Sequence, residues 1–399
     1  MMMTVLAAAI AISPFDSAFV VDTAFQTPAA LRVTGRHAST DWSFCAVSPD
    51  GARMAYIDPE FNDVRTYDLA AGAMTTALSH TAKTVFTWSD STEVIERPDG
   101  SRYLRVVEHS DPIRAREQGG PAVGASVGEV AIRTVVRQGR KQDEVNTPVA
   151  LAFGHDGSLL VSDVGSRRVI VMGPDGNFRS SFLLGDDEDA PSEMRLTPDG
   201  NLLCANLRLD RSTALNAGHN CNVYSMAGVR LQSFAYTPAS ALARNLWTGV
   251  RAVLDVDRKG YAFVAFSIDP EIHVWDSAGQ ERRAFGGPAA WFVSPRALRS
   301  PLSQREVVPT GFHESWTRPI KIVCFGDDHL LRATLANDRV AETDKPFLID
   351  VFSIAGTALG PTVASDAWPV GADSAGHIYF LTAAGDRLLK AHLTGAISR

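Results

Sequence analysis

Short apolar stretches alternate with small polar turns along most of the chain. From Val149 to Phe178 the order is VALAF, GHDG, SLLVSD, VGSRR, VIVM, GPDG and NF. Apolar segments of this length, bounded by Asp and Gly, are typical of β-strands, and Gly or Asp supplies the positive φ that a tight hairpin turn requires. The pattern therefore predicts a series of antiparallel hairpins.

The same pair of turns recurs along the sequence. A first turn begins at Ser48, Gly154, Thr197, Asp257, Gly326 and Asp373, and a second turn follows at Asp68, Gly173, Ser225, Asp276 and Ser353. Each unit thus contains four short antiparallel strands, repeated at intervals of about 45 to 65 residues, which is typical of a propeller blade. Such a sheet buries its two faces only by stacking radially against its neighbours.

Counting these units favours seven blades in an all-β propeller, with six as the alternative. Complete units lie at about 42–80, 148–185, 192–235, 250–287 and 318–360. Residues 84–138 predict a less regular seventh blade, and without it six remain. Residues 366–395 supply three strands, so we expect the fourth to come from near Ala30–Thr34. Residues 25–399 are then one domain, closed by N-terminal and C-terminal strands.

One unit resembles the NHL repeat, a known propeller motif. The residues that match the repeat are Pro148, Ala152, Asp156, Gly157, Leu160, Val161, Asp163, Arg168 and Val169. The unit at 42–80, with its Ser-Pro-Asp-Gly turn, looks more like a TolB-like or WD-type blade. The resemblance implies a propeller of six or seven blades but no particular activity, because propellers host many functions.

Charge and the N-terminus narrow the classes of function. The 399 residues carry a formal charge of −7, which argues against a nucleic-acid partner, and no apolar run reaches the roughly 18 residues that a membrane-spanning helix needs. Residues 1–24 begin with a short apolar segment, Met1–Ile12, and predict an export signal or a disordered N-terminus. We expect a monomer that is periplasmic or secreted, with a cytoplasmic location as the alternative.

The longest connections between strands are expected on one rim of the propeller. They lie at 206–220, 236–249, 287–318 and 337–345, and long loops in a compact domain commonly carry function. Aromatic and Arg side chains on them suit recognition of a protein, a glycan or a small molecule, or else they pack onto the blades below. The candidate binding residues are Trp247, Trp291, Phe292, Arg296, Phe312, His313, Glu314, Trp316 and Arg318.

A propeller hydrolase, lactonase or lyase is the alternative to a binding module without a cofactor. Such enzymes resemble this architecture and hold a divalent ion in the axial channel through oxygen ligands from several blades. Asp163, Asn206 and Asp269, near the ends of second strands, are the candidate ligands, and calcium is the candidate ion. The distribution of long loops favours the binding module.

The four cysteines form no metal-binding motif. Cys45 and Cys324 lie within apolar strings and are expected to be buried. Cys204 ends one predicted strand and Cys221 begins the next, which predicts a disulfide across the base of the loop between them.

Overall fold

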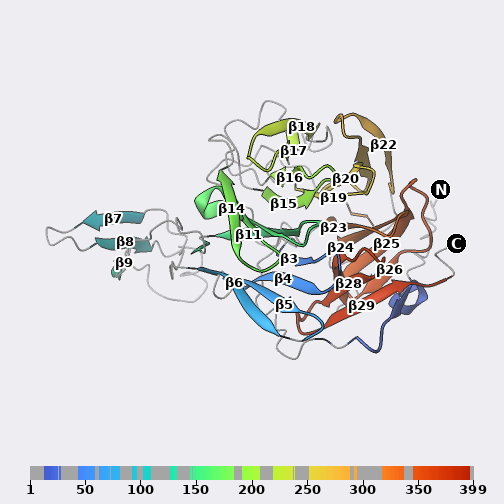
Figure 1. Ribbon diagram of the computed structural model, residues 1–399, viewed down its shortest axis with the longest axis horizontal. Coiled ribbons are helices and arrows are strands. Elements are labelled where there is room, and N and C mark those ends of the chain that lie inside the picture. Colours follow the sequence, from blue (N-terminus) through green and yellow to red (C-terminus); the bar gives the residue numbers. More distant parts are fainter. Residues whose placement is uncertain are drawn as a thin grey trace, which may run out of the picture.

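Six antiparallel sheets stand around a common axis as the blades of a propeller in the computed structural model (Figure 1). The structure describes residues 13–25, 27, 44–58, 63–71, 73–80, 92–96, 102–108, 126–132, 144–145, 147–183, 191–206, 219–236, 238, 251–287, 292–293, 317–336 and 345–395. Among these residues there is no helix with the length and apolar character needed to cross a membrane.

The first three blades follow one another along the chain. Blade 1 contains β3 (Cys45–Val47), β4 (Arg53–Asp58), β5 (Asp63–Asp68) and β6 (Met74–His80), with β10 (Glu144–Val145) beside β6. Blade 2 contains β11 (Pro148–Phe153), β12 (Leu159–Asp163), β13 (Arg168–Met172) and β14 (Phe178–Leu183). Blade 3 contains β15 (Pro191–Leu196), β16 (Leu202–Asn206), β17 (His219–Tyr224) and β18 (Arg230–Tyr236).

The last three blades complete the circle. Blade 4 contains β19 (Ala252–Val256), β20 (Ala262–Phe266), β21 (Ile272–Trp275) and β22 (Glu281–Phe285). Blade 5 contains β23 (Arg318–Phe325), β24 (His329–Leu335), β25 (Phe347–Ser353) and β26 (Val363–Ser365), with β1 (Ser13–Pro14) beside β26. Blade 6 contains β27 (Ala367–Ala372), β28 (Ile378–Thr382), β29 (Leu388–Leu393) and β2 (Phe19–Val21).

The favoured count of seven blades is wrong, and the alternative of six holds. The innermost strands contact one another in the order β3, β11, β15, β19, β23 and β27, and β27 returns to β3. Residues 84–138 contribute a separate sheet of β7 (Thr92–Glu96), β8 (Arg102–Glu108) and β9 (Ser126–Ile132). Because β3 packs directly against β11, no blade stands between blades 1 and 2.

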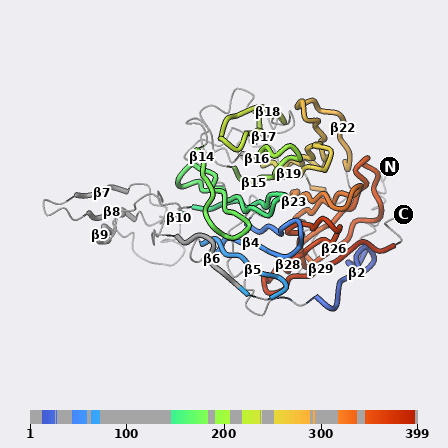
Figure 2. Tube along the Cα trace, in the orientation of Figure 1, coloured from blue at the N-terminus to red at the C-terminus, as the bar shows by residue number. Residues whose placement is uncertain are grey.

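An N-terminal strand completes the last blade. β2 pairs antiparallel with β29, matching Phe19 with Leu393, and Figure 2 shows the two strands side by side. The predicted donor, Ala30–Thr34, lies outside the described residues. The strand comes instead from within residues 1–24, whose expected role as an export signal stays a prediction.

Both faces of the middle blades are buried, which explains their nearly continuous apolar strands. Leu202 and Cys204 of β16 belong to a cluster shared with blade 2, whereas Leu203 and Ala205 pack toward blade 4. The predicted turns are confirmed, because the glycines that they require adopt the left-handed backbone conformation with a positive φ. Gly157 at the first turn of blade 2 has a φ of 77°. Its amide donates to the Gly154 carbonyl at 2.9 Å.

Candidate functional site

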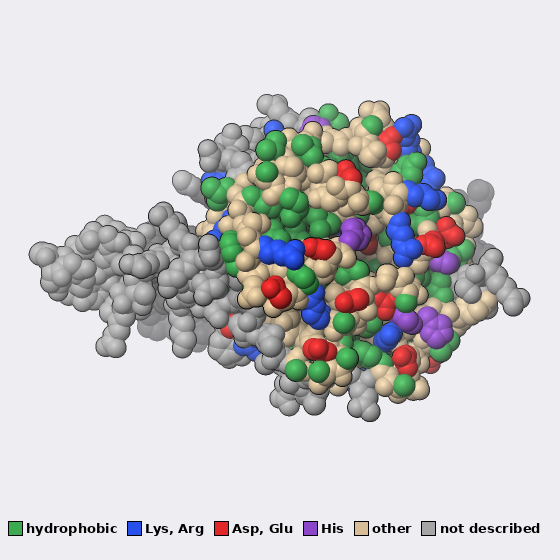
Figure 3. All heavy atoms as spheres, viewed as in Figure 1, with side chains coloured by type: hydrophobic (Ala, Val, Ile, Leu, Met, Phe, Trp, Pro, Cys, Tyr) green, Lys and Arg blue, Asp and Glu red, His purple; other side chains and the backbone are tan. Residues whose placement is uncertain are grey.

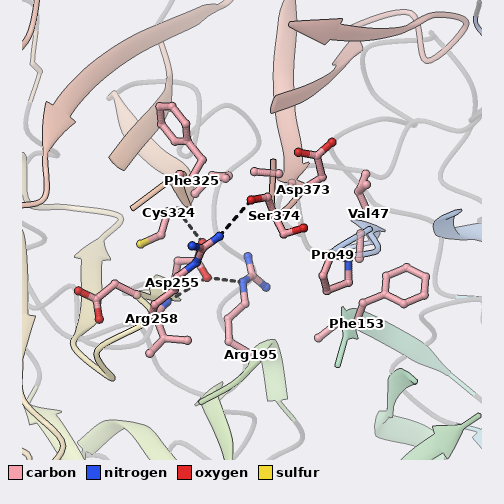
Figure 4. A pocket seen from close by; sticks show the side chains of 18 of the residues that line it. Val47, Pro49, Phe153, Arg195, Asp255, Arg258, Cys324, Phe325, Asp373 and Ser374 are labelled. Carbon is pink, nitrogen blue, oxygen red and sulfur yellow. Dashed lines mark hydrogen bonds and ion pairs between the residues drawn. The ribbon is translucent and has the colours of Figure 1, made fainter. Parts of the chain in front are cut away.

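A pocket of about 200 Å³ opens on the propeller axis, where the innermost strands end and enter the first turns. All six blades contribute side chains to it. Figure 4 shows Val47, Pro49 and Phe153 on one side and Asp255, Arg258 and Cys324 on the other, with Arg195 reaching between them. The pocket therefore combines an apolar wall with a charged wall.

The charged wall is part of a network of four charged side chains, of which Arg195 and Asp255 line the pocket. Arg195 Nε donates to Asp255 Oδ1 at 2.9 Å, and its Nη2 donates to Glu193 Oε1 at 3.0 Å. Lys321 Nζ donates to the same Glu193 oxygen at 2.9 Å. Because Glu193 belongs to blade 3 and Lys321 to blade 5, this last ion pair spans the width of blade 4 at the axis.

Burial controls the ionisation of this network. It lowers the pKa of Lys321, an effect that the nearby Glu193 opposes, and it raises the pKa of Asp255 in spite of the charge on Arg195. The Asp255 carboxylate is held further by the Cys324 amide, which donates to Oδ2 at 2.7 Å. Poorly hydrated charges of this kind depend on their partners, so the network is stable only as a set.

Arg258 lies over the mouth of the pocket. Its guanidinium forms an ion pair with Asp327 of blade 5 and donates to the Ser374 carbonyl of blade 6 at 3.1 Å. Two arginines and four aspartates line the pocket, which gives it a formal charge of −2 with its histidines neutral. Figure 3 shows acidic, basic and His side chains interspersed over this view of the ring, without a large patch of one sign.

The predicted binding residues on the long loops lie mostly outside the described residues: Trp247, Trp291, Arg296, Phe312, His313, Glu314 and Trp316. Two of the set are described. Phe292 packs against Leu348 and Ala364, as the packing alternative expected. Arg318 is buried at the start of β23, and burial together with its charge lowers the pKa of Arg251 to about 10.

The three candidate axial metal ligands lie in three different blades. Asp163 is fully buried and accepts a hydrogen bond from the Thr147 amide at 2.8 Å, which ties blade 2 to its preceding connection. The backbone of Asn206 pairs with Pro191, and its side chain lies outside the described part. Asp269 follows β20 in blade 4 and lies close to Glu271 and His273 instead.

The predicted disulfide between Cys204 and Cys221 is not formed. Cys204 pairs across the strands with Asn222, whereas Cys221 pairs with Ala205. Successive residues of a strand point to opposite faces, so this offset of one residue separates the two sulfurs. Cys204 faces blade 2 and Cys221 faces blade 4.

Sequence reasoning missed the axial charges, although a signal was present. Glu193, Arg195, Asp255 and Lys321 each stand inside a first strand of a blade, a position where the repeat otherwise places apolar or small residues. Charged residues in the innermost strand have only the axis or a neighbouring blade to face.

No protein-family model and no curated protein sequence matches the chain. Virginiamycin B lyase from Staphylococcus aureus is 14% identical, with a TM-score of 0.43, over 88% of this chain and 94% of that chain. The RRP9 WD40 repeats are 11% identical, with a TM-score of 0.43, over 92% and 84%. A DUF4221 member from Bacteroides vulgatus is 9% identical, with a TM-score of 0.44, over 78% and 94%. The assignment as a propeller follows from the strand order above.

Proposed function

We propose that the protein is a ligand-binding β-propeller that takes a small molecule into its axial pocket. The observation that carries this proposal is the convergence of all six blades on one cavity with an apolar and a charged wall. Concave sites with apolar linings and a few placed polar groups are the usual form of small-molecule sites. A volume of about 200 Å³ limits the ligand to a small molecule.

The charge of the pocket sets the class of ligand. A lining with a formal charge of −2 disfavours carboxylates and phosphates and favours an uncharged or amine-bearing molecule. An ammonium group would meet the aspartates, while its hydrocarbon part would pack on Val47 and Phe153. Arg258 has to move aside for a ligand to enter along the axis.

A larger partner, such as a protein or a glycan, would use the long-loop face on the opposite rim. An extracytoplasmic location would go with an export signal in the apolar segment Met1–Ile12, which precedes the strands β1 and β2 of the propeller. The resemblance of blade 2 to the NHL repeat is proposed to be structural, since Asp163 holds the Thr147 amide.

The alternative of a hydrolase or lyase with an axial divalent ion finds less support in the described channel. Of the carboxylates near the axis, Glu193 and Asp255 both already face Arg195, and Lys321 is also bonded to Glu193. A divalent ion between them would be repelled by both cations.

A pocket-filling substitution tests the proposal. Ala372 lines the pocket, so Ala372→Trp places an indole in the cavity, whereas Ala375→Trp adds the same indole at an exposed position of the adjoining turn. Saturation-transfer NMR with a library of small amines and matched carboxylates is the assay. We expect amines to bind the wild type and Ala375→Trp but not Ala372→Trp. Equal binding to all three proteins contradicts the proposal.

A further inference from the structure

A group of metal-binding side chains lies away from the axial pocket in blade 4, with Asp269 and Glu271 on the connection between β20 and β21 and His273 on β21. Asp269, Glu271 and His273 each offer one ligand atom, and these three atoms lie within 4.8 Å of one another. One imidazole nitrogen and two carboxylate oxygens form a donor set that suits a divalent first-row metal ion.

A fourth side chain fixes the orientation of the imidazole. His273 Nδ1 lies 2.7 Å from Glu281 Oε1 on β22, so the natural role of Nδ1 is to donate its proton to that carboxylate. Metal-binding histidines typically donate their second ring nitrogen to a carboxylate in this way, which leaves the other nitrogen as the ligand. Phe266 and Trp275 flank the ring, with centroids at 5.7 and 5.5 Å.

The other ring nitrogen, Nε2, gives an independent indication that a ligand binds at this place. His273 Nε2 is a buried atom that has no hydrogen-bond partner among the described residues. Its nearest carboxylate oxygen, Asp269 Oδ2, lies 3.6 Å away, which is too long for a good hydrogen bond. Two ligands at roughly 2.1 Å from a tetrahedral zinc lie about 3.4 Å apart, so this spacing fits two corners of one coordination sphere.

Local charge also favours a cation at this place. The carboxylates of Asp269, Glu271 and Glu281 surround one imidazole. The guanidinium of Arg332, next to this connection, is already bound to Asp350, at 2.7 Å, and to the backbone carbonyls of Pro270 and Gly286. The imidazole alone does not offset this excess of negative charge, whereas a divalent ion would.

We propose that Asp269, Glu271 and His273 bind one divalent transition-metal ion, for which Zn²⁺ is the natural probe. Glu281 acts as a positioning residue that orients the imidazole. Because Glu281 lies on β22, the ion links the connection between the second and third strands to the outermost strand of the blade. This site is distinct from the axial pocket and does not depend on the function proposed for it.

Zinc titration of the metal-stripped full chain tests the site. Calorimetry should show one Zn²⁺ bound to the wild type, with a higher melting temperature in zinc than in EDTA. His273→Gln and Asp269→Asn should each weaken binding at least about tenfold, and Glu281→Gln about 10-fold to 100-fold. Co²⁺ in place of zinc should give a visible absorption band that His273→Gln abolishes.

A second histidine provides a matched control. His377 lies four residues after Asp373, with Nδ1 2.9 Å from its carboxylate, and so repeats the spacing of His273 and Asp269 outside the three-residue group. His377→Gln should bind zinc as the wild type does. If His273→Gln fails to fold, Asp269→Asn and Glu271→Gln carry the test. A wild type that binds no zinc, or equal binding by all variants, overturns the proposal and leaves an ion pair of protonated His273 with its carboxylates.

Discussion

Removing the charge of Lys321 should lower the free energy of unfolding, because it breaks a buried ion pair at the propeller axis. Lys321→Met keeps most of the length of the side chain and leaves Glu193 without its blade 5 partner. Both side chains are 1% exposed, so water does not screen the pair. Breaking a buried ion pair costs about 3–5 kcal/mol. Since Glu193 keeps Arg195 at 3.0 Å and the Leu254 amide at 3.2 Å, we expect about 3 kcal/mol.

Urea unfolding at pH 7, followed by circular dichroism, measures this loss. The double variant Glu193→Gln with Lys321→Met should recover part of the lost stability, because it no longer holds a buried carboxylate without its Lys321 partner. Arg258→Gln is the control: its ion pair with Asp327 is 58% and 75% exposed, so its loss should stay below about 1 kcal/mol. A loss below about 1 kcal/mol for Lys321→Met, with an unchanged slope in urea, would refute the reasoning.

Two further predictions concern how the ring is closed and how its turns are made. Phe19 of β2 is 1% exposed whereas its neighbour Val20 is 44% exposed, so Phe19→Ala should cost about 3–5 kcal/mol in urea unfolding and Val20→Ala little. Gly200 and Gly228 both have a φ of 80°, but a Cβ on Gly228 would lie 2.8 Å from the Leu183 carbonyl oxygen, whereas none of the described atoms lies within 4 Å at Gly200. Gly200→Ala should therefore cost about 1–2 kcal/mol and Gly228→Ala clearly more, and equal losses would contradict the steric argument.

The hairpins were predictable because local chemistry determines them. Turns such as Gly154–Gly157 need a residue with positive φ, and the sequence places Gly there in blade after blade. The number of blades was not predictable in the same way. Residues 84–138 have the strand pattern of a blade, but only the packing of β3 against β11 shows that they do not enter the ring.

Register and long-range contacts limited the prediction of the site. A shift of one residue separates Cys204 from Cys221, and strand boundaries read from sequence do not resolve such a shift. Glu193 and Lys321 are 128 residues apart and meet only because the ring closes. Asp269 was singled out from its place at a strand end, yet its partner His273 was not, because His273 lies within β21 and the two side chains meet away from the axis.

A crystal structure with the tightest-binding small amine would test whether the axial pocket is the ligand site. We expect the amine to lie on the axis, with its hydrocarbon part against Phe153 and its nitrogen toward the pocket aspartates, and the Arg258 side chain to have moved from Ser374. An amine bound on the long-loop face, with the axial pocket unchanged, would contradict it.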